Sequence, residues 1–319
     1  DFTTNPWQRG TSFSAIANAA YSADRWVVGY TTSAAQTASK AADAPTAAQA
    51  GTFTQHCLSL AVTTADTSIA AGDYFFTHQT IEGLNAASFG FGQAGTRYVT
   101  LSFWVKGTKT GIHCVQVANS AGNRSYVAEY TINSTNTWEY KTITIPVDTT
   151  GTWLYDTGIG LNVRFVLMSG TTHHASADTW IAGGPLATSN QVNALDSTSN
   201  TFKIALVQLE AGSVATTFDA RSVGTELALC QRYYQLAGMG GSYYNAAASQ
   251  QARFSSTPAV TPRTSPTFTL ITSVGVGNIS SVTPSSNNSG ATLGMHLISS
   301  GGSGVYTDGN YTYSLTAEL

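Results

Sequence analysis

The sequence predicts an all-β protein in which a β-sandwich or barrel precedes a smaller β-rich C-terminal domain, with a short helix linking the two. Short runs of alternating apolar and polar residues recur along the chain, and clusters of Gly, Ser, Thr and Asn separate them. Many short strands with regular turn signals are typical of sandwiches and barrels. Beyond residue 222 the chain becomes rich in Gly, Ser and Thr. We therefore expect domains at residues 1–222 and 223–319, since 319 residues exceed the usual size of one domain.

The clearest predicted strand covers residues 99–106. Four apolar residues alternate there with other side chains and would share one face, whereas Trp104 falls on the opposite, mostly polar face. The apolar face holds Val99, Leu101, Phe103 and Val105. Further strands are predicted at residues 113–118, 138–147, 163–168, 202–209, 260–276 and 292–299.

The stretch at residues 33–50 is ambiguous because it is rich in Ala, which favours a helix by propensity. Ser and Thr are interleaved with the alanines, however, Pro45 interrupts the run and Gly51 follows it. These residues oppose a continuous helix. We therefore predict a strand over residues 26–30 that runs into a loop.

Helices are expected only in short pieces, at residues 81–88 and 224–234. In the second, Leu227, Cys230 and Tyr234 recur at helical spacing, and an acidic residue occupies the first turn, where it suits the helix dipole. Near the end of the chain, an Asp-Gly pair between two Tyr-containing runs predicts a β-hairpin within residues 306–319.

Composition and charge exclude several classes of protein. Charged residues make up only 10%, the net charge is -3, and the mean hydropathy is -0.03. A neutral polar surface suits a protein that is buried in a permanent assembly or that contacts sugars. No run of basic residues exists to neutralise phosphates, so we expect no nucleic acid as partner. No stretch of 18 or more apolar residues exists either, so we expect no membrane insertion.

The three cysteines predict reduced thiols. Cys57, Cys114 and Cys230 are odd in number and widely spaced, and no C-x-x-C pair indicates zinc. Reduced thiols fit synthesis in a reducing cytoplasm.

Three segments together resemble a known family. The first combines Asn5–Phe13 with Tyr21–Trp26; the second combines Thr100–Gly107 with Trp138–Trp153; the third runs from Val207 through Arg221 to Tyr234. In order and spacing they resemble the phage tail-fibre and virion-protein family that carries a carbohydrate-binding-module-like jelly roll. The likeness covers residues 1–236, and beyond them only the composition is similar.

This resemblance implies a jelly-roll sandwich in residues 1–222 and a place on the virion exterior, after synthesis in the cytoplasm of a bacterial host. It implies that the chain forms a homotrimer. It also implies other virion proteins and a glycan of the host surface as binding partners. It does not separate a tail fibre from a head fibre or a baseplate appendage, because the module is reused and fold does not set function.

No catalytic constellation is visible, and we predict no catalytic residues and no enzyme. The G-x-S-x-G, H-E-x-x-H and P-loop patterns are absent. His173 and His174, with Asp178 nearby, are interpreted as a solvated loop, since adjacent side chains on an extended segment point in opposite directions. No cofactor is expected, although the resemblance allows a structural calcium with Asp219 as a ligand; a calcium-loop motif is not present.

Sugar recognition is the chemistry that the aromatic residues favour, because aromatic rings stack on the apolar faces of pyranoses. The alternative for each residue is packing, either in its own domain or between subunits. Trp7, Trp26 and Trp138 are interpreted as structural. The candidates for glycan contact are Trp104 on its strand, Trp153, Tyr155 and Trp180 in loops, and Tyr243, Tyr244, Tyr306 and Tyr311 in the C-terminal domain.

The sequence thus favours a virion fibre or spike protein that attaches to a host, by glycan binding. One alternative is a purely structural head-decoration or connector protein, and another is a secreted carbohydrate-binding module. A third is a depolymerase, which needs two carboxylates about 5 to 9.5 Å apart in a cleft.

Overall fold

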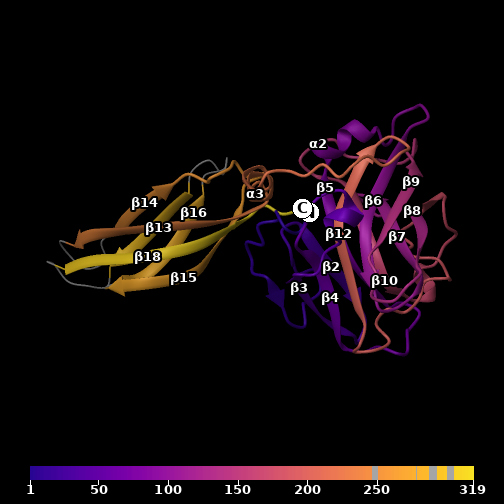
Figure 1. Cartoon of the computed structure of the whole chain (residues 1–319). Helices are drawn as coiled ribbons and strands as arrows, with labels where there is room; N and C mark the ends of the chain where they lie inside the picture. The colour runs from indigo at the N-terminus through magenta and orange to yellow at the C-terminus, as the bar shows by residue number, and fades with distance from the viewer. Residues whose placement is uncertain (246–250, 278, 287–292, 300–304) are drawn as a thin grey trace. The chain divides into compact units, whose positions relative to one another are not determined.

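A computed structural model describes residues 1–245, 251–277, 279–286, 293–299 and 305–319. The chain divides into two compact units, one formed by residues 1–223 with Leu319 and the other by residues 224–318 (Figure 1). Within the described residues, no helix is long and apolar enough to cross a membrane.

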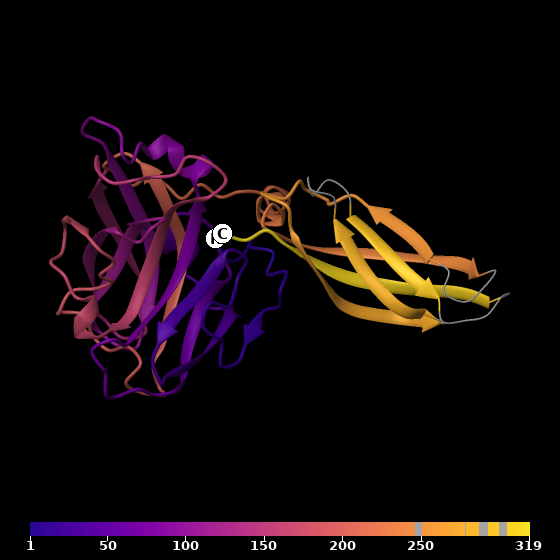
Figure 2. The ribbon, with the colours of Figure 1, turned by 180° about the vertical axis from the view of Figure 1, so that it is seen from behind.

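The first unit is a jelly-roll β-sandwich of two six-stranded antiparallel sheets (Figures 1 and 2). Neighbouring strands are mostly far apart in the sequence, as crossovers between two sheets require. Sheet 1 contains, in spatial order, β1 (Ser12–Phe13), β3 (Ala35–Ala41), β4 (Cys57–Thr64), β12 (Thr201–Ala211), β6 (Tyr98–Gly107) and β9 (Glu139–Pro146). Sheet 2 contains β11 (Trp180–Ala182), β8 (Arg124–Ile132), β7 (Gly111–Asn119), β10 (Ile159–Ser169), β5 (Tyr74–Glu82) and β2 (Trp26–Thr31).

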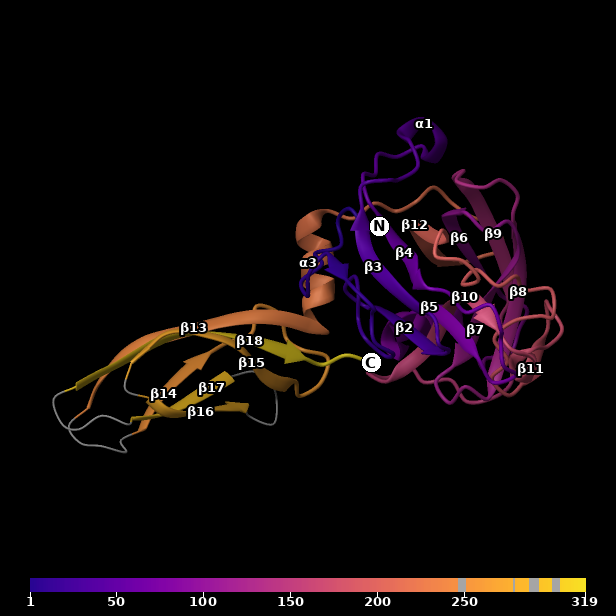
Figure 3. The ribbon, with the colours of Figure 1, turned by 90° about the horizontal axis from the view of Figure 1, so that it is seen from below.

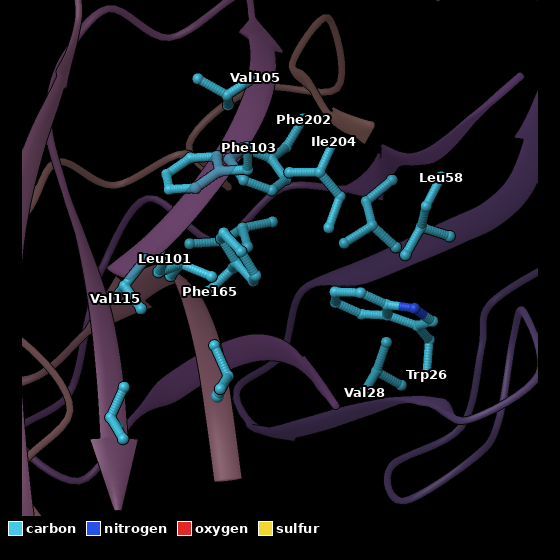
Figure 4. Packing of buried hydrophobic residues seen from close by; sticks show 14 of the residues in the cluster. Trp26, Val28, Leu58, Leu101, Phe103, Val105, Val115, Phe165, Phe202 and Ile204 are labelled. Atoms are coloured by element: carbon cyan, nitrogen blue, oxygen red, sulfur yellow. The ribbon is translucent and has the colours of Figure 1, made fainter. Parts of the chain in front are cut away.

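The core lies between the two sheets, and the alternation in β6 is confirmed. Its four predicted apolar residues are fully buried, and Phe103 meets Phe165 of the opposite sheet edge-to-face at a centroid distance of 5.0 Å. Figure 4 shows the side chains of both sheets interleaving around Phe103, Phe165 and Trp26. Trp7 and Trp26 belong to this core, as expected. The predicted strands at residues 113–118, 138–147, 163–168 and 202–209 correspond to β7, β9, β10 and β12.

The Ala-rich stretch differs from the prediction. The strand predicted at residues 26–30 is present as β2, but the expected loop contains a second strand, β3, and one turn of helix, α1 (Ala47–Ala50). Figure 3 shows α1 in the connection between β3 and β4. The alternation of small residues in β3 puts Gln36 and Ala38 inside, where pairing with β4 stabilises it. Tertiary pairing therefore overrides the helical propensity of Ala.

The other short helices are close to expectation. Residues 81–88 end β5 and then form α2 (Gly83–Ala86) and the start of the 3-10 turn η1 (Ala87–Phe89), so the predicted helix is half its expected length. The helix predicted at residues 224–234 is α3 (Val223–Gln231). A second 3-10 turn, η2, covers Thr171–His173.

The second unit is β-rich and consists of two three-stranded antiparallel sheets. In it, Tyr311, Tyr313 and Leu315 are buried, and Phe268 packs on Tyr313 at 4.6 Å. One sheet contains β13 (Tyr234–Asn245), β18 (Val305–Thr316) and β15 (Thr267–Gly277), and the other β14 (Gln251–Ser256), β17 (Leu293–Ser299) and β16 (Ile279–Ser286).

The predicted C-terminal hairpin is wrong. Asp308 and Gly309 lie inside the single strand β18, whose backbone pairs with β13 on one side and β15 on the other. A turn at this point would break both ladders, so long-range pairing outweighs the local turn signal. The strand predicted at residues 260–276 begins later, at Thr267, because Pro262 and Pro266 cannot donate to a ladder.

Cys57, Cys114 and Cys230 form no disulfide, as predicted, and all three are buried. They lie on β4, β7 and α3. Burial raises the pKa of the Cys57 thiol to about 12, which leaves it uncharged and unreactive.

Candidate functional site

An aromatic pair lies on the face of sheet 1 that points away from the core. The alternation of β6 turns Trp104 outward, and the register of β9 brings Tyr140 directly opposite it. The two rings are 5.5 Å apart with an interplanar angle of 41°, and Tyr140 is 46% exposed. Cross-strand neighbours on one face are within contact distance in an antiparallel pair, so β pairing alone is enough to hold this platform.

A β-bulge in β12 forms the floor beside this pair. The register of β12 on β6 shifts between Ala205 and Gln208, so that an extra residue is accommodated in β12. Leu206, inside the bulge, has a φ of 49° and is only 3% exposed. A left-handed backbone at a bulky residue costs on the order of 1–3 kcal/mol and is concentrated at functional sites, as are bulges.

The residues around the bulge form a small apolar cluster outside the main core. Because Leu206 is pushed outward by the extra residue, it packs where a regular strand would leave a flat surface. The cluster contains Cys57, Trp138, Ala205 and Leu206, with Trp104, Phe218, Ala41 and Ala50 against it. Trp138 is thus structural, as predicted.

The first wall of the site is the one-turn helix α1. Thr46 caps it: the side chain of Thr46 accepts from the backbone N–H of Gln49, and the side chain of Gln49 accepts from the backbone N–H of Thr46. Gly51 ends the turn in the left-handed conformation, with a φ of 69°. This capping box holds a helix too short to be stable alone.

The second wall is the segment at residues 215–218, which β12 holds by hydrogen bonds. Glu210 accepts from the Thr216 backbone N–H at 2.9 Å and from the Thr216 hydroxyl at 2.7 Å. Gln208 accepts from the backbone N–H of Asp219 at 2.8 Å. The pKa of Glu210 is lowered, because these hydrogen bonds outweigh the opposing effect of burial. The carboxylate therefore stays ionised and keeps the wall in place.

Together these elements enclose an open groove of about 440 Å³, which we call the Trp104 groove. Its volume is in the range of small-molecule sites. No charged side chain lines it. Its polar lining comes from Gln49, Ser102, Thr216 and Thr217, and its apolar lining from Ala48, Ala50, Gly51, Trp104, Tyr140, Leu206, Ala215 and Phe218.

Close to this face of sheet 1, Asp43 forms ion pairs with two lysines. Its carboxylate accepts from Lys203 at 2.6 Å, from Lys106 at 3.0 Å and from the indole N–H of Trp138 at 3.2 Å. Burial acts to raise the pKa of Asp43, but these donors lower it to about 2. The network ties the loop after β3 to β6 and β12, and it keeps both lysines away from the groove lining.

The loop residues Trp153, Tyr155 and Trp180 are placed elsewhere, in an aromatic cluster around Phe91. Trp153, a predicted glycan contact, is 7% exposed, stacks on Phe91 at 4.4 Å and donates to the Thr150 carbonyl. Trp180 is half-buried and donates to the Pro146 carbonyl. Tyr155 is 38% exposed, with its hydroxyl bonded to Phe91. The cluster buries Trp153 and half-buries Trp180, whereas the ring of Tyr155 stays exposed.

The tyrosines of the C-terminal domain are only partly described. Tyr311 is 2% exposed inside its own unit, where it packs beside Tyr313, and its contact with a glycan stays a prediction. The backbones of Tyr243 and Tyr244 lie in β13 and that of Tyr306 in β18, but their side chains lie outside the described residues.

The histidine loop and Asp219 lie in no cluster of metal-ligating side chains within the described residues. Within the described ranges, no three His, Cys, Asp or Glu side chains are arranged to hold an ion. The rings of His173 and His174 contact the carbonyls of Gly72 and Ser169, respectively, and Asp219 is exposed. A calcium site formed by Asp219 and backbone oxygens stays a prediction.

Sequence reasoning found Trp104 but missed three of its neighbours. The outward position of Tyr140 could have been predicted from alternation, since Tyr140, Thr142 and Thr144 alternate with the buried isoleucines of β9. Leu206 and Phe218 gave no local signal, because only the bulge and the hydrogen bonds from Gln208 and Glu210 place them at the groove.

No family model matches the sequence, and no curated protein matches it. Among solved structures, the chain is similar to the enzymatically active domain of tailspike protein 4 of bacteriophage CBA120, at 14% identity and a TM-score of 0.34, over 62% of this chain and 21% of that one. It is similar to a family 11 carbohydrate-binding module from Clostridium thermocellum in complex with a mixed-linked tetrasaccharide, at 12% identity and a TM-score of 0.31, over 65% and 98% of the chains. A CBM4 structure is 12% identical with a TM-score of 0.32, over 66% and 98%. Scores this low carry no argument about function.

Proposed function

We propose that this chain is a glycan-binding attachment protein on the exterior of a bacteriophage particle, a fibre or spike, and that the Trp104 groove binds the glycan. The observation that carries the glycan site is the Trp104–Tyr140 pair, which presents aromatic surface in a groove with uncharged polar groups. The virion setting is supported by the three sequence segments described above and by the low content of charged residues.

The groove matches the two kinds of surface that a sugar presents. Aromatic rings pack against the C–H faces of a pyranose, whose burial is favourable in the same way as other apolar burial. The hydroxyl of Ser102 and the Nε2 of Gln49 make no hydrogen bond within the described residues, so both are available to sugar hydroxyls. Thr216 is held by Glu210 and contributes a fixed rim.

Catalysis is not part of this proposal. Among the described residues, no Asp or Glu lines the groove. A second pocket, on the outer face of sheet 2, has Glu129 as the one carboxylate in its lining. Glycoside hydrolysis by the usual mechanism needs a pair of carboxylates at the scissile bond.

The test is binding to an array of bacterial surface oligosaccharides, followed by titration calorimetry with the best ligand. Trp104→Ala and Tyr140→Ala should each weaken binding by about tenfold or more, as truncation of an aromatic hot spot does. Tyr98→Ala is the matched control, since Tyr98 is an aromatic residue of β6 that is 40% exposed and does not line the groove.

Equal binding by the Trp104 and Tyr98 variants would remove the groove from the proposal. No binding to any glycan, by a chain that still assembles with other virion proteins, would instead favour a structural head-decoration or connector protein.

A further inference from the structure

Arg164 occupies the middle of β10 on the outer face of sheet 2, opposite in the sandwich to the Trp104 groove. In the register of the sheet its neighbours are His78 on β5 and Gln116 on β7. The residue is half-buried, although it lies in the centre of a sheet face rather than at an edge. A cation in this position needs an explanation, because a charge removed from water is normally paired.

No carboxylate pairs with this guanidinium among the described residues. One N–H donates to the Oε1 of Gln116, and the guanidinium lies 5.2 Å from the centre of the Phe76 ring. The Nε atom is buried and has no partner. Burial lowers the pKa of Arg164 to about 10, which still leaves it charged at neutral pH. The positive charge is therefore balanced by nothing in the described part of the chain.

His78 adds a second unpartnered nitrogen directly beside Arg164. Its Nδ1 is buried without a hydrogen bond. Burial, and then the charge of Arg164, lower the pKa of His78 to about 3, so its ring is neutral at neutral pH. A neutral His78 adds no second charge beside Arg164, and a hydrogen bond of its ring with the backbone of Val27 opposes the lowering of its pKa. The charge at this place is therefore that of Arg164.

Aromatic rings flank this place. Phe76 and Tyr74 stack with centroids 5.5 Å apart and planes within 9° of each other. Gly29 on the next strand makes room for them, since a Cβ there would lie 2.5 Å from the Phe76 ring. Phe76 is buried and Tyr74 is half-buried, so the two rings support the guanidinium on its apolar side.

We propose that Arg164 binds the carboxylate of an acidic saccharide such as a uronic acid. The Nη2 of Arg164 makes no hydrogen bond and is not among the buried unpaired atoms, so it reaches solvent and can donate to a carboxylate. The half-buried ring of Tyr74 would pack against the sugar. The carboxylate site follows from the unpaired charge alone; only the choice of a saccharide as its carrier rests on the proposed function.

The experiment is thermal unfolding of the full chain in glucuronate, glucose and acetate at equal ionic strength. Glucuronate should raise the Tm by about 2 to 4 °C more than glucose or acetate does, because it binds the folded state alone. Arg164→Met should abolish this difference. Lys109→Met is the matched control, since Lys109 is a lysine already paired with Asp196. It should keep the full shift.

Arg164→Lys keeps a charge but lacks the planar fork, and it should lose most of the shift while folding normally. The proposal is overturned if glucuronate acts no better than glucose, if acetate matches it, if a Glu-containing peptide exceeds it, or if the shift survives in Arg164→Met. Binding of the array-selected glycan through Trp104 is measured on the same samples. Its failure would remove the proposed groove and leave the Arg164 result standing, so the two outcomes are distinguishable.

Discussion

At the scale of single residues, the fully buried aromatic residues of β6 and β10 determine how well the sandwich packs. Phe103 is completely buried and meets Tyr130 at 5.1 Å and Phe165 at 5.0 Å, both edge-to-face. Because protein interiors are close-packed, its removal would leave a cavity that the neighbouring strands cannot fill.

We predict that Phe103→Ala lowers the free energy of unfolding by about 3 to 5 kcal/mol. The measurement is urea denaturation followed by fluorescence. Phe53→Ala is a suitable control, since Phe53 is 71% exposed, and it should change stability by less than about 0.5 kcal/mol. Similar losses for both variants would contradict the position of the core.

Two buried histidines predict how stability depends on pH. Burial lowers the pKa of His113 to about 4 and that of His78 to about 3, from the ordinary value of 6.5 for histidine. The unfolded chain therefore binds more protons between these values and pH 6.5. This contribution to stability is complete above pH 6.5 and is lost as the pH falls toward 4 and 3.

The expected slope is up to about 1.4 kcal/mol per pH unit for each histidine in this window. Denaturation at a series of pH values between 7 and 5 measures it. His113→Phe keeps a ring between Tyr130 and Phe202 and removes the titration, so its slope should be visibly shallower. An unchanged slope would exclude His113 as a source.

At the scale of elements, the groove depends on an irregular strand and on two short segments that the strand holds. The bulge in β12 brings Leu206 to the surface of sheet 1, while Gln208 and Glu210 hold the segment that follows. The Thr46 capping box does the same for α1. Each wall is thus attached by a few hydrogen bonds rather than by the core, and each can be loosened without unfolding the sandwich.

We predict that Glu210→Ala frees the segment at residues 215–218, because Thr216 loses both of its bonds to the carboxylate. Amide hydrogen exchange at Thr216 should become at least about tenfold faster, and glycan binding should weaken, while the midpoint of unfolding stays nearly constant. Asp196→Ala, which removes the partner of Lys109 outside the groove lining, is the control. Faster exchange at Thr216 in both variants would indicate general loosening instead.

At the scale of the whole molecule, the first unit has a core of its own, contributed by both sheets. A unit with a complete core can fold without the rest of the chain. We predict that residues 1–222 alone unfold cooperatively and keep the affinity of the full chain for the groove ligand. Calorimetric titration of both proteins measures this. A folded fragment with no affinity would place the glycan site in the C-terminal unit.

The proposed attachment role predicts a trimer in solution. Light scattering at several concentrations should give a constant mass near three times the 33.4 kDa of one chain. Burial of a surface with only 10% charged residues would favour such an assembly. A stable monomer would contradict the trimer. It would favour a lone carbohydrate-binding module, or a virion protein that assembles only on its partner.

Short sequence patterns predicted the features that depend on interactions within one strand or helix. Alternation in β6 identified its buried face and turned Trp104 outward, because a strand has only two faces. The spacing of Leu227 and Cys230 predicted α3. The Asp-Gly pair wrongly predicted a hairpin, because the two strands that pair with β18 are distant in sequence. The loop predicted in the Ala-rich stretch was wrong for the same reason, since β3 pairs with the distant β4.

By itself, the sequence determined an all-β fold, reduced buried cysteines and an outward Trp104, since periodicity and burial preference act within a few residues. Only the tertiary structure decided that Tyr140, Leu206 and Phe218 join Trp104 in a groove and that Trp153 is buried. It alone also shows that Arg164 has no counter-charge among the residues that the structure describes. These facts depend on which strands become neighbours. Pairings between residues tens of positions apart are set by the packing of the whole sandwich, and no short window of sequence contains them.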